Sequence, residues 1–80
     1  MEFVMAKRNN QLLTDLGNRI RMLREQGGFA QEKFAFTIEM DRSFYGMVER
    51  GERNISFLNL AKIAKGLGLP LEEVVKGIKS

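Results

Sequence analysis

One short stretch, residues 41–51, carries side chains that suit contact with an anionic polymer. Asp41 is a good helix N-cap, and Gly51 can take the left-handed conformation that ends a helix. Between them the helical repeat brings one set of residues onto an outer face that is nearly free of negative charge. The set is Arg42, Ser43, Gly46, Met47 and Arg50. Because it mixes hydrogen-bonding groups with a glycine that permits close approach, we predict that this face lies in a DNA groove.

Two segments before this stretch have the apolar spacing of helices packed on one side. The pattern predicts one helix over residues 11–26, ended by the glycines at 27 and 28, and another over about 31–38. Small Ala35 would let the second helix cross closely over the helix that follows Asp41, as in a helix-turn-helix. We therefore expect the polar stretch to be the second helix of such a motif.

Two further helices are predicted after it. Ser56 is a strong N-cap for a helix over residues 57–67, and Pro70 suits the first turn of a last helix. The last helix carries more apolar surface than one short terminal helix usually buries in its own monomer, so we expect a dimer contact there. The residues concerned are Leu71, Val74, Val75 and Ile78.

Composition limits the class of protein. The 80 residues suffice for one small domain, which we place at 11–80 behind a flexible arm at 1–10, and the net charge of +3 favours an anionic partner. There is no histidine or cysteine, no phosphate-cradling glycine loop and no carboxylate cluster at metal spacing, so we expect no enzyme, cofactor or metal site. No apolar run approaches the roughly 20 residues that span a bilayer. A bacterial cytoplasm or nucleoid is the simplest location.

Residues 16 to about 75 resemble the lambda-repressor-like, or Cro-type, helix-turn-helix family. The matching strings, in order, are residues 16–24, 30–35, 40–44, 48–51, 56–60 and 63–70. The stand-alone length and residues 49–56 are most similar to the controller proteins of restriction-modification systems. The resemblance implies an all-α, five-helix domain with the helix-turn-helix at helices 2 and 3.

The resemblance also implies a role for each matching position. The base-reading residues would be Arg42, Ser43, Phe44, Gly46 and Met47. The residues on the DNA backbone would be Gln31, Arg50, Arg53 and Asn54. Arg24 and Glu49 match an ion pair that ties the first helix to the third, although desolvation opposes its net stabilising value. The other arginines near the first helix, Arg19 and Arg21, are expected to form a solvated, salt-bridged surface.

Four residues depart from the family pattern. Ala30 is a poor cap for the second helix, so Gln31, Glu32 or a bound phosphate must occupy its free amides. Glu39 stands where a turn glycine is usual, and would cost about 1 kcal/mol or more if left-handed. Tyr45 replaces an aliphatic core residue and must find a partner for its hydroxyl, and Phe36 replaces a solvated polar residue.

Arg42 is the first choice for sequence reading, since a guanidinium can bond to O6 and N7 of guanine together. Ser43 is a weaker reader, and Phe44 and Met47 could contact a thymine methyl group. For each of these residues the alternative is a surface or core position without DNA contact. Arg50 could instead cap the helix end or pair with an acid.

A lone domain of this size makes few contacts, so we expect a homodimer on a near-palindromic double-stranded operator. Its half-sites would lie about 34–36 Å apart. The expected function is transcriptional regulation, as the autoregulating controller of a restriction-modification system, with RNA polymerase as a further partner if the protein activates. The alternative is an antitoxin-type or phage-type repressor that binds a protein through Phe36 or the last helix. The operator, the controlled genes, the choice between activation and repression, and any DNA contact by the arm stay open.

Overall fold

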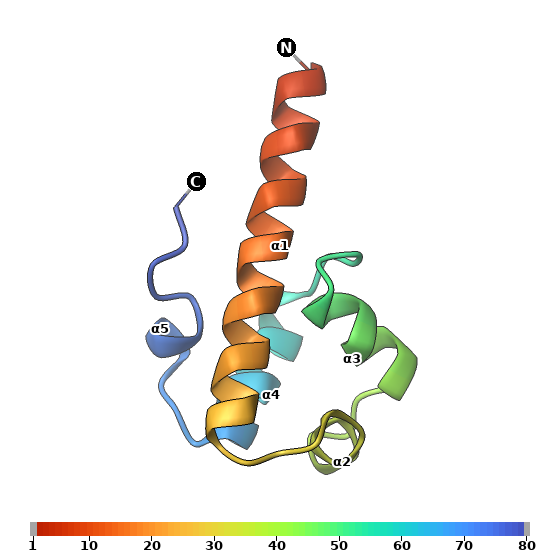
Figure 1. The fold of residues 1–80 in the computed structure, drawn as a ribbon, viewed down its shortest axis with the longest axis vertical. Helices are drawn as coiled ribbons and strands as arrows, with labels where there is room; N and C mark the ends of the chain where they lie inside the picture. The colour runs from red at the N-terminus through yellow and green to blue at the C-terminus, as the bar shows by residue number, and fades with distance from the viewer. Residues whose placement is uncertain (1, 80) are drawn as a thin grey trace.

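The computed structural model describes the backbone of residues 2–79 and the side chains of residues 11–79. No strand occurs within that backbone, and the predicted all-α, five-helix fold is confirmed. The longest helix, α1, stands upright in Figure 1, with the other four gathered around its C-terminal half. The helices are α1 (Glu2–Gln26), α2 (Gln31–Thr37), α3 (Arg42–Glu49), α4 (Phe57–Leu67) and α5 (Leu71–Val74). None of them, over the described residues, has both the length and the apolar character to cross a membrane.

The first and last helices have different bounds from those that the pattern predicted. α1 begins at Glu2 rather than at 11, because residues 2–10 contain no glycine or proline that would interrupt it. Mobility of this segment, and its contact with DNA, stay predictions. α5 is a single turn, and the chain leaves the helix before Gly77, whose φ of 82° is left-handed.

The helix caps explain why the middle of the chain folds as predicted. Asp41 accepts a hydrogen bond from the backbone nitrogen of Phe44 at 2.9 Å, and Ser56 accepts one from that of Asn59 at 3.1 Å. Both side chains thereby occupy amides that a helix start leaves without a partner. Ala30 provides no such bond at the start of α2, as expected.

The core is built from all five helices around Tyr45 and Phe34, whose rings lie 5.5 Å apart. Val74 of α5 is fully buried in this core. Its assignment to a dimer surface was therefore wrong, because the domain itself covers the side chain. The fully buried large side chains are those of Tyr45, Phe34, Ile20, Ile63, Val48 and Val74.

The crossing of α2 and α3 forms the expected helix-turn-helix. Ala35 is fully buried at the crossing, and its carbonyl accepts a hydrogen bond from the backbone nitrogen of Met40 at 2.9 Å. Glu39, in the turn, has a φ of 56°, so a residue with a side chain occupies the left-handed conformation that the sequence anticipated. The turn is also held to α4, since Lys62 Nζ donates to the carbonyl of Glu39 at 3.3 Å.

A close approach fixes α1 against the end of α3. A Cβ atom on Gly17 would lie 2.4 Å from the carbonyl oxygen of Glu49 and 2.6 Å from that of Val48. One turn earlier in α1, Thr14 leaves no room for a Cβ on Gly51, the glycine that ends the α3 segment with a φ of 75°. Only glycine fits at these two contacts, so α1 and α3 pack backbone to backbone.

Candidate nucleic-acid interface

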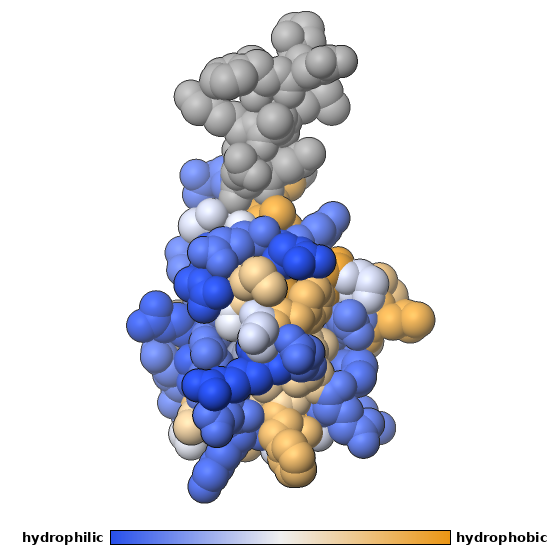
Figure 2. All heavy atoms as spheres, turned by 90° about the vertical axis from the view of Figure 1, so that its right-hand side faces the viewer, coloured by the Kyte–Doolittle hydropathy of each residue, from blue (hydrophilic) through white to orange (hydrophobic). Residues whose placement is uncertain are grey.

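The outer face of α3, from Arg42 to the C-cap residue Arg50, forms an open hollow beside the start of α2. α3 lies on the side of the molecule that Figure 2 turns toward the reader, where hydrophilic side chains flank a strip of hydrophobic ones. The structure thus brings together four of the predicted base readers and two of the predicted backbone contacts. The residues lining the hollow are Gln31, Arg42, Ser43, Gly46, Met47 and Arg50.

Arg42 stands at the edge of this hollow with an exposed guanidinium. Its Nη1 lies 3.0 Å from Oε2 of Glu32, and these side chains are 69% and 65% exposed. An ion pair this exposed is worth little in water, so Arg42 can exchange Glu32 for another acceptor. The sequence did not predict this pair, because it joins two helices and no spacing along one helix indicates it.

Phe44 does not line the hollow. Its ring packs partly against the core, and the Arg53 guanidinium carbon lies 5.6 Å from the ring centroid. At this distance the aromatic face attracts the cation, so Phe44 supports an exposed arginine beside α3. The predicted base contact by Phe44 therefore has no support from its position, whereas Arg53 remains available to a phosphate.

Asn54 also lies away from the hollow. Its side-chain oxygen accepts a hydrogen bond from the backbone nitrogen of Ile55 at 2.8 Å, and the residue borders an apolar groove between α1 and the C-terminal segment. Of the predicted dimer residues, Val75 and Ile78 line this groove, while Leu71 is half-buried against the core. The groove is lined by Leu12, Leu13, Leu16, Asn54, Val75 and Ile78.

The predicted backbone contacts Gln31 and Arg50 already have partners within the protein. Gln31 Nε2 donates to Glu49 Oε1 at 2.9 Å, and Arg50 Nε donates to Glu52 Oε1 at 3.1 Å. The Arg50 pair is exposed, so it would yield readily to DNA. The Gln31 amide is different, because one of its two N–H donors is engaged by a buried carboxylate, which fixes the orientation of the amide.

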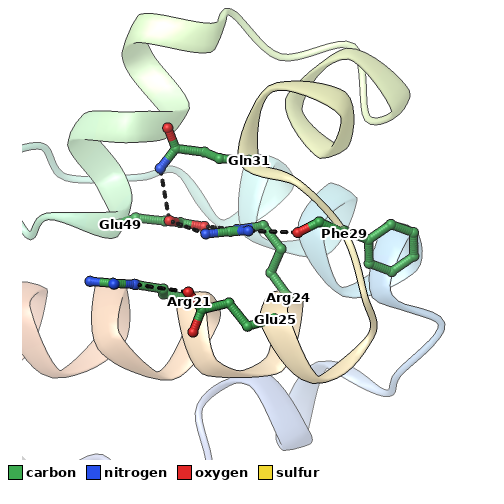
Figure 3. Close-up of polar contacts among 6 residues, drawn as sticks. All are labelled: Arg21, Arg24, Glu25, Phe29, Gln31 and Glu49. Atoms are coloured by element: carbon green, nitrogen blue, oxygen red, sulfur yellow. Dashed lines mark hydrogen bonds and ion pairs between the residues drawn. The ribbon is translucent and has the colours of Figure 1, made fainter.

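The buried carboxylate of Glu49 is the centre of a network beneath the hollow (Figure 3). Arg24 Nε and Nη2 donate to it at 2.6 and 3.1 Å, which confirms the predicted ion pair, and Arg24 Nη1 donates to the carbonyl of Phe29. Burial opposes ionisation of Glu49, but the hydrogen bonds, foremost that from Arg24, outweigh it and lower the pKa of this carboxyl group. α1, α2 and α3 are thereby joined by Arg24, Gln31 and Glu49.

Tyr45 lies under the same network with its ring fully buried. Among the described residues, its hydroxyl makes no hydrogen bond of good geometry, although the Glu49 carboxylate and the Arg24 guanidinium lie beside it. Burial and, after it, the adjacent carboxylate of Glu49 raise the pKa of Tyr45 well above its ordinary value. The hydroxyl is therefore neutral, and its poor hydrogen-bond geometry offsets only part of the free energy lost on leaving water.

Arg19 and Arg21 of α1 are both paired, as expected for a salt-bridged surface. Arg19 donates from Nε and Nη2 to the carbonyl of Glu73 at 3.0 and 2.8 Å, which ties α5 to α1. Arg21 pairs with Glu25 one turn along the same helix. Beside α3, the exposed arginines are Arg42, Arg50 and Arg53.

A family model described as helix-turn-helix matches residues 20–74, which include all of α2, α3 and α4. Together with the motif and the hollow described above, this match shows that the chain belongs to the helix-turn-helix family and is a DNA-binding regulator. Within that family it is similar to restriction-modification controller proteins, as the sequence predicted. The control protein C.MunI of Mycoplasma sp is 41% identical over 71 residues, which cover 88% of this chain and 96% of that protein.

Two solved controller structures have the same fold. C.AhdI from Aeromonas hydrophila is 44% identical, with a TM-score of 0.75 over 78% of this chain and 94% of that chain. C.Esp1396I, solved as a tetramer on its natural 35-base-pair operator, is 29% identical, with a TM-score of 0.69 over 81% of this chain and 96% of that chain.

Proposed function

We propose that this protein binds a near-palindromic operator as a homodimer and thereby controls the genes of a restriction-modification system, its own included. The observation that carries the proposal is the hollow along α3, lined by two exposed arginines, in a chain that is 41% identical to a control protein. The C.Esp1396I tetramer on its operator supports assembly of more than one copy on DNA. Such a regulator works in the cytoplasm, on the nucleoid, and as an activator it would also contact RNA polymerase.

In this proposal α3 enters the major groove with Arg42 and Ser43 leading. Arg42 leaves Glu32 and offers two parallel N–H groups to a guanine, which discriminates against other bases by about 1–3 kcal/mol. Ser43 and Met47 contact neighbouring base edges. Arg53, held over Phe44, reaches a phosphate, and it adds affinity without sequence preference.

The apolar groove between α1 and the C-terminal segment is the proposed dimer surface. Val75 and Ile78 contribute to it, and Val75 is 39% exposed in the monomer. A second copy would cover these side chains, and an 80-residue domain has little other core with which to stabilise itself. Two reading helices related by a two-fold axis would then fit half-sites about 34–36 Å apart.

A footprint of the purified protein on the DNA upstream of its own gene tests this function. We expect protection of two half-sites related by a dyad, and affinity that falls steeply as salt is raised. Equal affinity for that duplex and for random duplex at every salt concentration would contradict the proposal.

One observation favours a second function, an antitoxin-type or phage-type repressor that binds a protein partner. Phe36 of α2 is 84% exposed, and Phe57 and Leu58 at the start of α4 are 69% and 76% exposed. Large apolar side chains this exposed are typical of contact surfaces when they are contiguous. Co-purification of a partner that Phe36→Ser abolishes, with operator binding intact, would support this second function.

A further inference from the structure

We propose that Gln31 and Arg50 together read an amino-bearing base, with adenine as the best fit, in the gap above Gly46. The inference rests on the proposed operator binding and adds a specificity determinant from α2 to the readers on α3. It also replaces the phosphate contact that the family resemblance implied for Gln31.

The first step is the orientation of the Gln31 amide. Glu49 is 4% exposed and ionised, so it can only accept hydrogen bonds. The group of Gln31 that faces it at 2.9 Å must therefore be the NH2 group. Figure 3 shows the consequence, because the carbonyl oxygen of Gln31 points away from Glu49. The Gln31 acceptor oxygen is thus held on the side away from Glu49, while one N–H of the amide is bound to the carboxylate.

The second step is the gap itself. A Cβ atom built on Gly46 would lie 3.6 Å from Gln31 Oε1 and 3.1 Å from Arg50 Nη1. An acceptor and a donor therefore flank the same small space above the α3 backbone. Gln31 and Arg50 thus meet over Gly46, and both also line the open hollow, so a group that enters the hollow can contact both.

The third step is the chemistry of what fits there. Phosphate oxygens only accept hydrogen bonds, so a phosphate would be matched by Arg50 but not by Gln31 Oε1. An exocyclic amino group on a base donates, and adenine offers its N6 amino group beside the acceptor N7 in the major groove. Gln31 would accept from N6 while Arg50 donates to N7. Cytosine satisfies only the first contact, through N4.

Duplexes that lack single base atoms test this assignment. The probe is the footprinted operator with each adenine in turn replaced by purine, which lacks the amino group, or by 7-deaza-adenine, which lacks N7. For the native protein we expect an affinity loss of about tenfold on either replacement at one adenine in each half-site. Gln31→Met, of similar length but without an acceptor, should bind amino-bearing and amino-deleted duplexes equally. Arg50→Met should lose only the dependence on N7.

Lys33→Met is the matched control, since Lys33 is an exposed cation on the same helix outside the hollow. It should retain the full dependence on the amino group. Thermal unfolding of all three variants checks that each is folded at the assay temperature. The inference is overturned if folded Gln31→Met keeps that dependence, if it loses affinity equally for every duplex, or if only an N4-deleted cytosine weakens binding. A native protein without any sequence preference would overturn the proposed function itself.

Discussion

Arg24 of α1 and Glu49 of α3 form a two-pronged ion pair in which both residues are less than one-tenth exposed. Glu49 receives a third hydrogen bond from Gln31, which also lines the hollow along α3. The position of α3, the reading helix, relative to α1 therefore depends on a buried pair of opposite charges.

Removing one member of the pair should cost more than removing both. We expect Arg24→Met to lower the free energy of unfolding by about 3–5 kcal/mol, because it leaves the Glu49 charge buried without its main partner. The double variant Arg24→Met/Glu49→Met should recover most of that loss. Urea unfolding of the wild type, both single variants and the double variant measures the coupling. Equal losses in the single and the double variants would contradict this account.

The Arg24–Glu49 pair should also make the free energy of unfolding depend on pH. The pKa of Glu49 is lowered in the folded protein, so its contribution is complete at neutral pH. It is lost as the pH falls from the ordinary glutamate pKa, near 4.5, through the lower folded value. Unfolding free energies between pH 7 and pH 3 should therefore fall more steeply for the wild type than for Glu49→Gln. Parallel profiles would show that Glu49 does not ionise differently on folding.

Glu39→Gly should stabilise the protein. The φ of 56° costs a residue with a Cβ about 1 kcal/mol, which glycine avoids. We expect a gain of about that size in the free energy of unfolding. Glu39→Ala is the control, since alanine removes the charge but keeps the Cβ, and it should give no gain. A gain for alanine equal to that for glycine would assign the effect to charge.

Tyr45→Phe should also stabilise, by about 1 kcal/mol, because it removes a buried hydroxyl without a hydrogen bond of good geometry and keeps the ring. Tyr45→Leu, which removes the ring as well, should instead destabilise by leaving a cavity. Thermal unfolding distinguishes the two. A loss of stability in the phenylalanine variant would mean that the hydroxyl is hydrogen-bonded in solution.

Variants of Arg42 and Arg53 should distinguish recognition of the base sequence from general affinity for DNA. Arg42→Ala should relax the base preference at one position of each half-site. Arg53→Ala should weaken binding to all sequences alike and reduce the salt slope by about 0.9. A binding selection and a salt titration on each variant measure the two effects. An unchanged base preference for Arg42→Ala would show that Arg42 is not a reader.

Local signals were enough to predict the elements that carry the interface. Asp41 and Ser56 cap helices because their side chains reach amides three residues away, and such short-range contacts leave a clear pattern. Contacts between different helices leave no such pattern in the sequence. The burial of Val74 could not be predicted, since helical spacing shows that a residue is apolar but not which neighbour covers it. The Arg42–Glu32 pair is of the same kind.

The backbone contact at Gly17 has a consequence for the fit to DNA. With the carbonyls of Val48 and Glu49 against α1, the reading helix cannot rotate on its own without displacing the longest element of the domain. We therefore expect the protein to meet each half-site as one stiff body. If the spacing or twist of the two half-sites does not match the protein, the DNA must then bend to fit. The flexibility of base pairs that the protein does not contact would therefore influence which operator is bound.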